Sequence, residues 1–203
     1  MSFPANTSRS GDRQQLHTFA FADISGYSIF AERNGDEAAA DLAIRFVTRA
    51  STMASEHGAE VTKWVGDAVM IHTLDARMSV RLGLDLIAEF GDDPTFPPIH
   101  VGLHTGPALQ RADDWWGATV NIAALVSTAA KAGQMLVTEA TMLAAGRLDR
   151  IRLRALGLVH LKNLSSPMRV YAASPLPAPA RWPSGVTSRR GYLIRPNPAE
   201  LGP

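Results

Sequence analysis

Residues 59–73 read AEVTKWVGDAVMIHT, two short apolar runs separated by Gly66-Asp67. The runs are rich in β-branched residues, which favour strands, and a Gly-Asp pair between such runs is typical of a tight hairpin turn. The predicted hairpin carries one carboxylate at its tip, Asp67, and one cation within its first strand, Lys63. A charged side chain is rarely buried without a partner, so Lys63 either reaches solvent along its aliphatic stem or has a specific role.

The segments around this hairpin alternate between strand and helix patterns. Apolar alternation predicts strands at 17–23 and 99–106, and helical spacing predicts helices at 35–57 and 75–90. The resulting order is strand, helix, hairpin, helix, strand, which is that of a ferredoxin-like βαββαβ core in the α+β class. In that topology the first strand lies beside the hairpin, so we expect the carboxylate at its exit, Asp23, near the hairpin tip.

Further helix and strand patterns predict a C-terminal α/β extension of this core. They are found, in order, at 119–131, 134–138, 139–146, 151–161 and 169–173. The composition changes at Ser174, because seven of the thirteen prolines lie in residues 174–203. We therefore expect a flexible polar segment at 1–16, one folded domain at 17–173, and a Pro-rich, disordered tail at 174–203.

The composition of the 203-residue chain is that of a soluble globular protein, with 46% hydrophobic and 19% charged residues. Its formal net charge of +1 gives no broad basic face, so we expect no nucleic-acid partner. No apolar run approaches the roughly 20 residues that span a bilayer, and the polar N-terminus lacks the apolar segment of a signal peptide. Cysteine is absent, which excludes disulfides, thiolate metal sites and cysteine nucleophiles. These features predict a cytoplasmic protein with no membrane partner.

Two carboxylates that converge at a strand end form a site with only oxygen ligands. Hard cations such as Mg²⁺ prefer one or two carboxylates together with substrate phosphates, and the turn at Gly26 could present backbone N–H groups to phosphate oxygens. Aspartates are also common at strand ends and turns for structural reasons, so spacing alone leaves both interpretations of Asp23 and Asp67 open. His100 and His104 alternate along one strand, but no third metal ligand is evident, which favours ordinary strand-face histidines.

Five segments resemble, in order and at similar spacing, the sequence motifs of the class III nucleotidyl cyclases. They are FADISGYS at 21–28, KWVGDAVM at 63–70, VGLHTG at 101–106, DWWGATVNIAA at 114–124 and LKN at 161–163, the last followed by Pro167, Val170 and Tyr171. The resemblance covers roughly residues 17–173. No single motif would suffice, but five in sequence are specific.

The resemblance implies an adenylate cyclase, an enzyme that converts ATP to 3′,5′-cyclic AMP and pyrophosphate. It implies that Asp23 and Asp67 bind two Mg²⁺ or Mn²⁺ ions per site, with the backbone carbonyl of Ile24 as a further ligand. It also implies that the turn at Gly26 and Tyr27 contacts the substrate.

The same resemblance implies which residues bind the nucleotide. Lys63 and Asp114 match the pair that reads the purine, and their donor and acceptor pattern favours adenine over guanine. The adjacent Asp113 leaves this assignment open by one residue, although the spacing to the following Trp-Gly pair favours Asp114. Asn121 would orient the ribose in the transition state, and Lys162 would contact the triphosphate.

One position departs from the family pattern. The family expects an arginine four residues after Asn121, where it would stabilise charge on the α-phosphate, and this chain has Leu125 there. The family also builds each site from two chains, so the resemblance implies a homodimer with two shared sites. Trp115 and Trp116 are interpreted as packing residues rather than as a platform on which a base stacks.

Three functions are therefore compared. The first, which we favour, is an active adenylate cyclase. The second is a degenerate cyclase domain that binds nucleotide or acts as a regulatory dimerisation module, and Leu125 supports it. The third is an interaction domain of ferredoxin-like fold with no nucleotide role, and the intact metal-binding and purine-reading positions speak against it.

Overall fold

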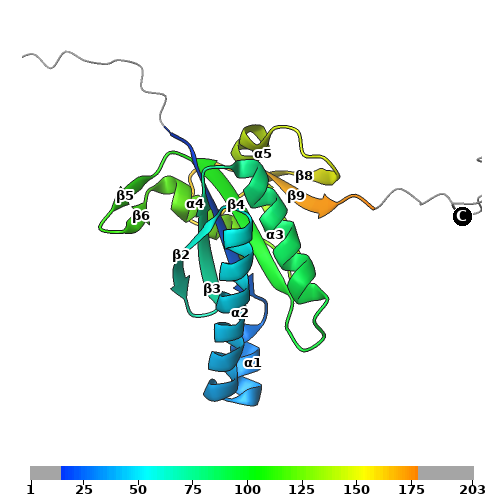
Figure 1. The fold of residues 1–203 in the computed structure, drawn as a ribbon. Helices are drawn as coiled ribbons and strands as arrows, with labels where there is room; N and C mark the ends of the chain where they lie inside the picture. The colour runs from blue at the N-terminus through cyan, green and yellow to red at the C-terminus, as the bar shows by residue number, and fades with distance from the viewer. Residues whose placement is uncertain (1–14, 178–203) are drawn as a thin grey trace, which may run out of the picture.

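The computed structural model describes residues 15–177, so the predictions for residues 1–14 and 178–203 lie outside the described residues. Within the described range the chain forms a seven-stranded sheet, a separate two-stranded hairpin and five helices (Figure 1). No helix in this part of the chain combines the length and the apolar character needed to cross a bilayer.

The first half of the described chain has the predicted ferredoxin-like order. Its elements are β1 (His17–Ile24), α1 (Tyr27–Asn34), α2 (Asp36–Glu56), β2 (Glu60–Val65), β3 (Ala68–Thr73), α3 (Ala76–Gly91) and β4 (Ile99–Gly106). The four strands pair antiparallel in the order β2-β3-β1-β4, which confirms the βαββαβ core. Strand β1 therefore lies between β3 and β4, with the hairpin at one edge of the sheet.

The second half extends this sheet beyond β4. Its elements are α4 (Ala118–Thr128), β7 (Met135–Thr138), α5 (Glu139–Ala145), β8 (Ile151–Val159) and β9 (Met168–Pro175). Strand β7 runs parallel to β4, and β9 and β8 follow it as antiparallel neighbours. The predicted C-terminal α/β extension is thus confirmed as a continuation of the same sheet.

A bulge in the hairpin decides where Lys63 points. The register slips between Val61, which pairs with Ile71, and Lys63, which pairs with Met70. Side chains directly opposite one another share a face of the sheet, and neighbouring residues on a strand face opposite ways. Ile71 lies in the main core and Met70 in a smaller cluster under α4, so the extra residue moves Lys63 out of the main core.

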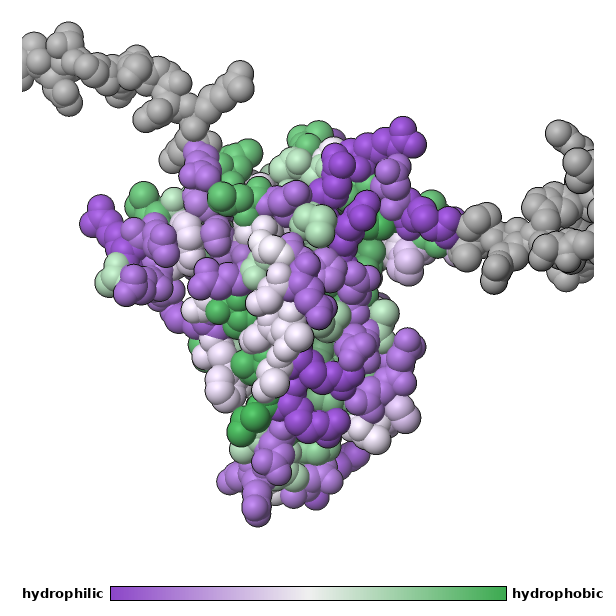
Figure 2. Space-filling model, in the orientation of Figure 1, coloured by the Kyte–Doolittle hydropathy of each residue, from purple (hydrophilic) through white to green (hydrophobic). Residues whose placement is uncertain are grey.

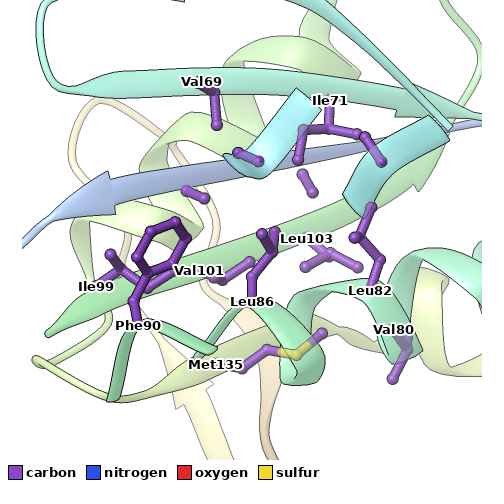
Figure 3. Packing of buried hydrophobic residues seen from close by; sticks show 14 of the residues in the cluster. Val69, Ile71, Val80, Leu82, Leu86, Phe90, Ile99, Val101, Leu103 and Met135 are labelled. Atoms are coloured by element: carbon purple, nitrogen blue, oxygen red, sulfur yellow. The ribbon is translucent and has the colours of Figure 1, made fainter. Parts of the chain in front are cut away.

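The main hydrophobic core lies between one face of the sheet and helices α2 and α3 (Figure 3). Phe46 of α2, Phe90 of α3 and Val101 of β4 are completely buried there. The visible surface over these helices combines hydrophilic residues with a near-neutral band and a few hydrophobic patches (Figure 2).

Helix α4 covers part of the opposite face, where it packs on β4, β1 and β7. Its approach to β4 depends on Gly102. A Cβ atom at that position would lie 2.0 Å from the backbone nitrogen of Ser127. A side chain there would push α4 off the sheet, so the glycine sets the height of the helix that carries Asn121.

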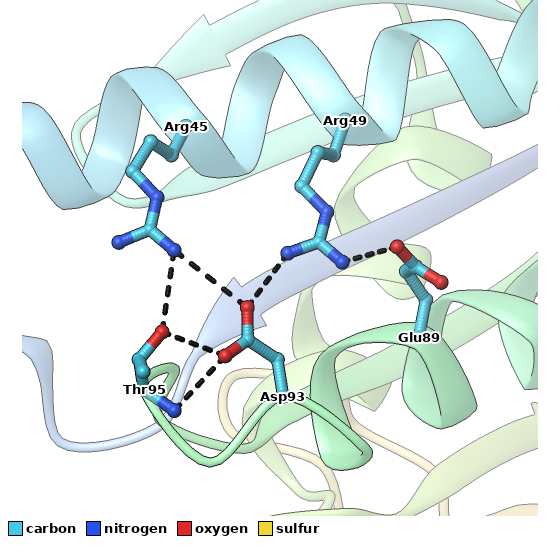
Figure 4. A network of polar contacts seen from close by, with 5 residues as sticks. All are labelled: Arg45, Arg49, Glu89, Asp93 and Thr95. Carbon is cyan, nitrogen blue, oxygen red and sulfur yellow. Dashed lines mark hydrogen bonds and ion pairs between the residues drawn. The ribbon is translucent and has the colours of Figure 1, made fainter.

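A polar network ties α2 to the loop before β4 (Figure 4). Arg49 of α2 donates to Asp93 at 2.9 Å and also pairs with Glu89 of α3. Asp93 accepts hydrogen bonds from the backbone and hydroxyl of Thr95, and these bonds, with Arg49, lower the pKa of Asp93 to about 2. The same loop ends at Pro98, whose carbonyl accepts from the backbone N–H of Ser25 at 2.9 Å, so the network helps to hold the turn after β1.

A two-stranded arm, β5 (Leu109–Arg111) and β6 (Asp114–Trp116), follows β4 in the chain and precedes α4. It projects away from the main sheet (Figure 1). Trp115 fastens the arm to the sheet. Its ring centroid lies 4.3 Å from that of His72 and 4.6 Å from that of His17, and the two imidazoles contact each other through Nδ1 and Nε2 at 3.0 Å. Trp115 is therefore a packing residue, as predicted, whereas Trp116 is 58% exposed.

Burial favours the neutral form of the two histidines under Trp115. Burial, and then the neighbouring His17, lower the pKa of His72 from 6.5 to about 4. Burial also lowers the pKa of His17. Since the folded-state pKa of His72 is depressed, its contribution to stability is fully present above pH 6.5 and is lost as the pH falls toward 4.

We expect His72→Gln to flatten the dependence of stability on pH, because glutamine keeps an amide near His17 but takes up no proton. Allowing for solvent screening, the free energy of unfolding lost by the wild type between about pH 7 and pH 4.5 should exceed that lost by the variant by about 1–2 kcal/mol. Urea unfolding across this range measures both values. His160→Gln, at an exposed histidine, is the control. Equal pH slopes for wild type and His72→Gln would contradict the expectation.

Candidate active site

The two aspartates predicted to bind metal lie next to each other at one end of the sheet. Asp23 of β1 pairs with Ala68 at the start of β3. Asp67 occupies the hairpin turn, and its backbone carbonyl accepts a hydrogen bond of 3.4 Å from the N–H of Ile24. Burial, followed by a hydrogen bond with the Asp67 carboxyl and the charge on it, raises the pKa of Asp23 to about 7. The fold therefore holds two carboxyls together at an electrostatic cost that a cation would relieve.

The atoms at this end of the sheet suit a hard divalent cation. Asp23 Oδ1 is buried and has no hydrogen-bond partner, so one carboxylate acceptor at this strand end is unsatisfied. Among residues 15–177, no group of three or more His, Asp or Glu side chains forms a metal cage by itself. Mg²⁺ commonly takes only one or two protein carboxylates and completes its shell with water and phosphate oxygens. Two aspartates thus fit a cation that takes its remaining ligands from water or a bound phosphate.

The turn after β1 is built as predicted, with Gly26 in the left-handed region at φ 77°. No side chain caps the N-terminus of α1, so the first-turn N–H groups lack a side-chain acceptor. The Tyr27 hydroxyl donates to the carbonyl of Ala39 at 3.0 Å, which ties α1 to α2. Tyr27 thus has a structural contact, and only the backbone of this turn is arranged for an anion.

Lys63 and Asp114 meet although 51 residues separate them in sequence. Lys63 Nζ donates to Asp114 Oδ2 at 2.5 Å, and the backbone N–H of Trp115 donates to Asp114 Oδ1 at 2.9 Å. Lys63, with this backbone N–H, lowers the pKa of Asp114. Asp113 lies in the arm's turn at φ 60° and is exposed, so the structure brings Asp114 rather than Asp113 to the lysine.

The two residues predicted to act on the ribose and the triphosphate are solvent-exposed. Asn121 lies in the first turns of α4, and its backbone N–H bonds to the carbonyl of Gly117 at 3.4 Å. Lys162 lies in the turn between β8 and β9. Both side chains are free of the hydrophobic core, as groups that contact a ligand from outside the chain must be.

Leu125, at the position where the family has an arginine, has a packing role. It packs against a second hydrophobic cluster that includes Val126 of α4 and Leu161, the residue before Lys162. Leu164 joins the same cluster from the other side of the turn. The side chain at the expected arginine position therefore joins α4 to the turn that carries Lys162.

Sequence reasoning missed two side chains of this site, Ser25 and His100. His100 lies directly opposite Asp23 on β4, and its Nε2 is 3.5 Å from Asp23 Oδ2. Ser25 Oγ lies 3.1 Å from His100 Nδ1. His100 was interpreted as an ordinary strand-face histidine, and only the strand register, which no local pattern reveals, places it beside a carboxylate.

Three comparisons with known proteins agree with this geometry. A family model described as "Adenylate and Guanylate cyclase catalytic domain" matches residues 12–173. Among curated proteins, the chain is 33% identical over 129 residues to a pH-sensitive adenylate cyclase of Mycobacterium tuberculosis and 29% identical over 120 residues to an adenylate cyclase of Streptomyces coelicolor. These matches cover 64% and 59% of this chain. They span only 32% of each relative, so the chain corresponds to about a third of their length.

Solved structures share the fold. The adenylyl cyclase CyaB from P. aeruginosa has a TM-score of 0.67 at 25% identity, covering 87% of this chain and 96% of its own. An adenylate cyclase from Trypanosoma brucei has a TM-score of 0.74 at 23% identity, covering 84% and 92%. The latter match concerns the fold alone. With the family model covering most of its length, the chain belongs to the adenylate and guanylate cyclase catalytic domain family.

Proposed function

We propose that this chain is an adenylate cyclase that converts ATP to 3′,5′-cyclic AMP and pyrophosphate. The observation that carries the proposal is the joint presence of two pairs: Asp23 with Asp67, and Lys63 with Asp114. The first pair fits a metal-bound phosphate, and the second offers one donor and one acceptor to a base. The adenylate cyclases among its relatives support the assignment.

Asp23 and Asp67, with the Ile24 carbonyl, would hold two Mg²⁺ or Mn²⁺ ions. Bound there, the ions would supply charge neutralisation at the α-phosphate and lower the pKa of the ribose 3′-hydroxyl. The two aspartates contribute the negative charge that retains the cations. The uncapped N-terminus of α1 after Gly26 contributes N–H groups that face phosphate oxygens.

Lys63 and Asp114 would select adenine. The lysine can donate to adenine N1, and the aspartate can accept from the 6-amino group. Guanine presents a hydrogen at N1 and an oxygen at C6, so it would oppose both groups. In the free chain the two residues satisfy each other, and the base replaces that contact with two of its own.

The reaction forms a bond between the ribose 3′-oxygen and the α-phosphorus. The bond from the α-phosphorus to the oxygen that bridges to the β-phosphate breaks, and pyrophosphate leaves with that electron pair while the 3′ proton passes to solvent. Asn121 would orient the ribose so that the attacking oxygen lies in line with the leaving group. Lys162 would balance charge on the triphosphate.

We further propose that the site is shared between two copies of the chain in a homodimer. The hairpin and the arm, which carry Lys63 and Asp114, also expose large apolar side chains: Trp64, Val65, Leu109 and Trp116. Exposed apolar residues beside polar binding groups are typical of a protein interface. One chain would supply the aspartates that hold metal and its partner the groups that bind the base and the ribose.

The substrate assignment is tested by incubating the purified chain with Mn²⁺ and either ATP or GTP and resolving the products by chromatography. We expect cyclic AMP from ATP, and a rate with GTP lower by about 10–100-fold, because guanine would leave polar groups unpaired. Lys63→Ala should reduce this preference. Measurable ATP binding with no cyclic nucleotide formed at high protein concentration would contradict the enzymatic proposal.

The shared site is tested by mixing two variants that are each impaired with ATP. Asp67→Ala and Lys63→Ala chains should regain activity when combined, because a heterodimer contains one complete site. With random pairing, about half of the dimers have one of two sites restored, so about a quarter of wild-type activity is expected. Asp67→Ala mixed with Asp23→Ala is the control, since both changes fall in the same half. If the mixture of Asp67→Ala with Lys63→Ala shows no rescue, the proposal of a site shared between two chains is wrong.

Leu125 favours a second candidate function, a catalytically weak or degenerate domain that binds nucleotide or acts as a regulatory dimerisation module. A cation aimed at transition-state charge is worth roughly 10²–10³ in rate, and this position supplies none. The packing of Leu125 against the Lys162 turn shows that the position has a structural use.

Leu125→Arg separates the two candidates. We expect it to raise turnover of Mn²⁺-ATP by about tenfold or more. Leu125→Met, which keeps the packing and adds no charge, should leave the rate unchanged, and thermal unfolding of both variants checks the fold. A rate unaltered by arginine in a folded chain would show that this position does not limit the reaction. Activity found only in the arginine variant would establish the degenerate module.

A further inference from the structure

The two oxygens of the Asp23 carboxylate have different surroundings. Oδ1 is buried without a hydrogen-bond partner. Oδ2 faces the imidazole of His100, whose Nε2 lies 3.5 Å away, a close polar contact that is longer than an ordinary hydrogen bond. The Asp23 side chain is 35% exposed, and almost none of that exposure comes from Oδ1, so Oδ2, beside His100, is the oxygen open to a ligand.

The strand register makes this contact a fixed feature. Asp23 and His100 are cross-strand partners on the antiparallel pair β1 and β4, so their side chains leave the sheet on the same face. The His100 side chain is only 14% exposed. A side chain enclosed in this way has few alternative rotamers, and its ring cannot easily leave the carboxylate.

Ser25 determines which imidazole nitrogen serves Asp23. Its hydroxyl lies 3.1 Å from His100 Nδ1, and its backbone is anchored through the 2.9 Å bond to Pro98. A carboxylate only accepts hydrogen bonds, so the tautomer with a hydrogen on Nε2 suits Oδ2. Nδ1 then accepts from the hydroxyl, and the chain of contacts runs from Ser25 through His100 to Asp23.

We propose that His100 is a positioning residue that orients the Asp23 carboxylate toward a divalent cation, with Ser25 fixing the tautomer of its ring. The inference rests on the proposed function, because the cation is the one that accompanies the nucleotide. By contacting Oδ2, the imidazole stops the carboxylate from rotating and keeps this exposed oxygen directed into the site. Outer partners of this kind typically change metal affinity by about 10–100-fold when they are removed.

The experiment measures Mn²⁺ binding to the full chain from the electron paramagnetic resonance signal of free Mn²⁺. The solution contains 3′-deoxy-ATP, which lacks the attacking hydroxyl, so no turnover occurs. His100→Leu should raise the dissociation constant of Mn²⁺ by about 10–100-fold. His100→Gln should recover most of the affinity, because its amide N–H can replace the Nε2 donor, and Ser25→Ala should cause a smaller loss than His100→Leu.

His104→Leu is the matched control. His104 lies on the same face of β4, is also buried, and bonds to Thr138 through Nδ1 at 2.8 Å, away from Asp23. The His104→Leu chain should bind Mn²⁺ as tightly as the wild type does. Wild-type affinity in a folded His100→Leu chain, or an equal loss in His104→Leu, would overturn the inference.

Asp23→Ala separates this inference from the proposed function. If Asp23→Ala loses Mn²⁺ while His100→Leu retains it, the positioning role is wrong and the metal site stands. If neither change weakens binding, or if the wild type binds no Mn²⁺, the metal site itself is wrong, and the inference falls with it.

Discussion

The register of β1 is the constraint on which the site depends. This strand is hydrogen-bonded along both edges, to β3 and to β4. Its pairing places Asp23 beside the hairpin on one side and opposite His100 on the other. A slip of one residue would turn Asp23 into the hydrophobic core and bring a core side chain to the site. The apolar residues of β1 that face α2 and α3, such as Ala20, Ala22 and Ile24, fix that register through their burial.

The site holds its charged groups at a cost to the stability of the free chain. Two carboxyls lie together with one buried oxygen unsatisfied, and the raised pKa of Asp23 reports that cost. In the Lys63–Asp114 pair, by contrast, each group satisfies the other. In the proposed function a cation would relieve the first pair, and a base would replace the mutual contact of the second. Strain of this kind is common where a fold serves a ligand.

Much of the fold was predictable because its signals are local. The hairpin turn at Gly66-Asp67, the strand at Ile99–Gly106 and the helix after Asp75 each depend on residues close in sequence. Their order then gave the ferredoxin-like core, and with it the approach of Asp23 to the hairpin. The spacing to the following Trp-Gly pair also favoured Asp114 over Asp113, and it is Asp114 that contacts Lys63 in the structure.

The features that escaped prediction depend on contacts between distant segments. The bulge before Lys63 adds one residue to a strand, and no local pattern shows on which side it falls. The cluster of His17, His72 and Trp115 joins three elements. His100 acquires its neighbour only through strand pairing. In each case the decisive fact is a register or a tertiary contact rather than a motif.

In the proposed homodimer, one chain holds the metal and its partner holds the base. A crystal structure of the protein with Mn²⁺ and 3′-deoxy-ATP, with anomalous diffraction to locate the metal, tests this arrangement most directly. We expect Mn²⁺ beside Asp23 and Asp67 of one subunit, with the adenine between Lys63 and Asp114 of the other. Adenine and metal bound by the same subunit, or Mn²⁺ away from these aspartates, would contradict it.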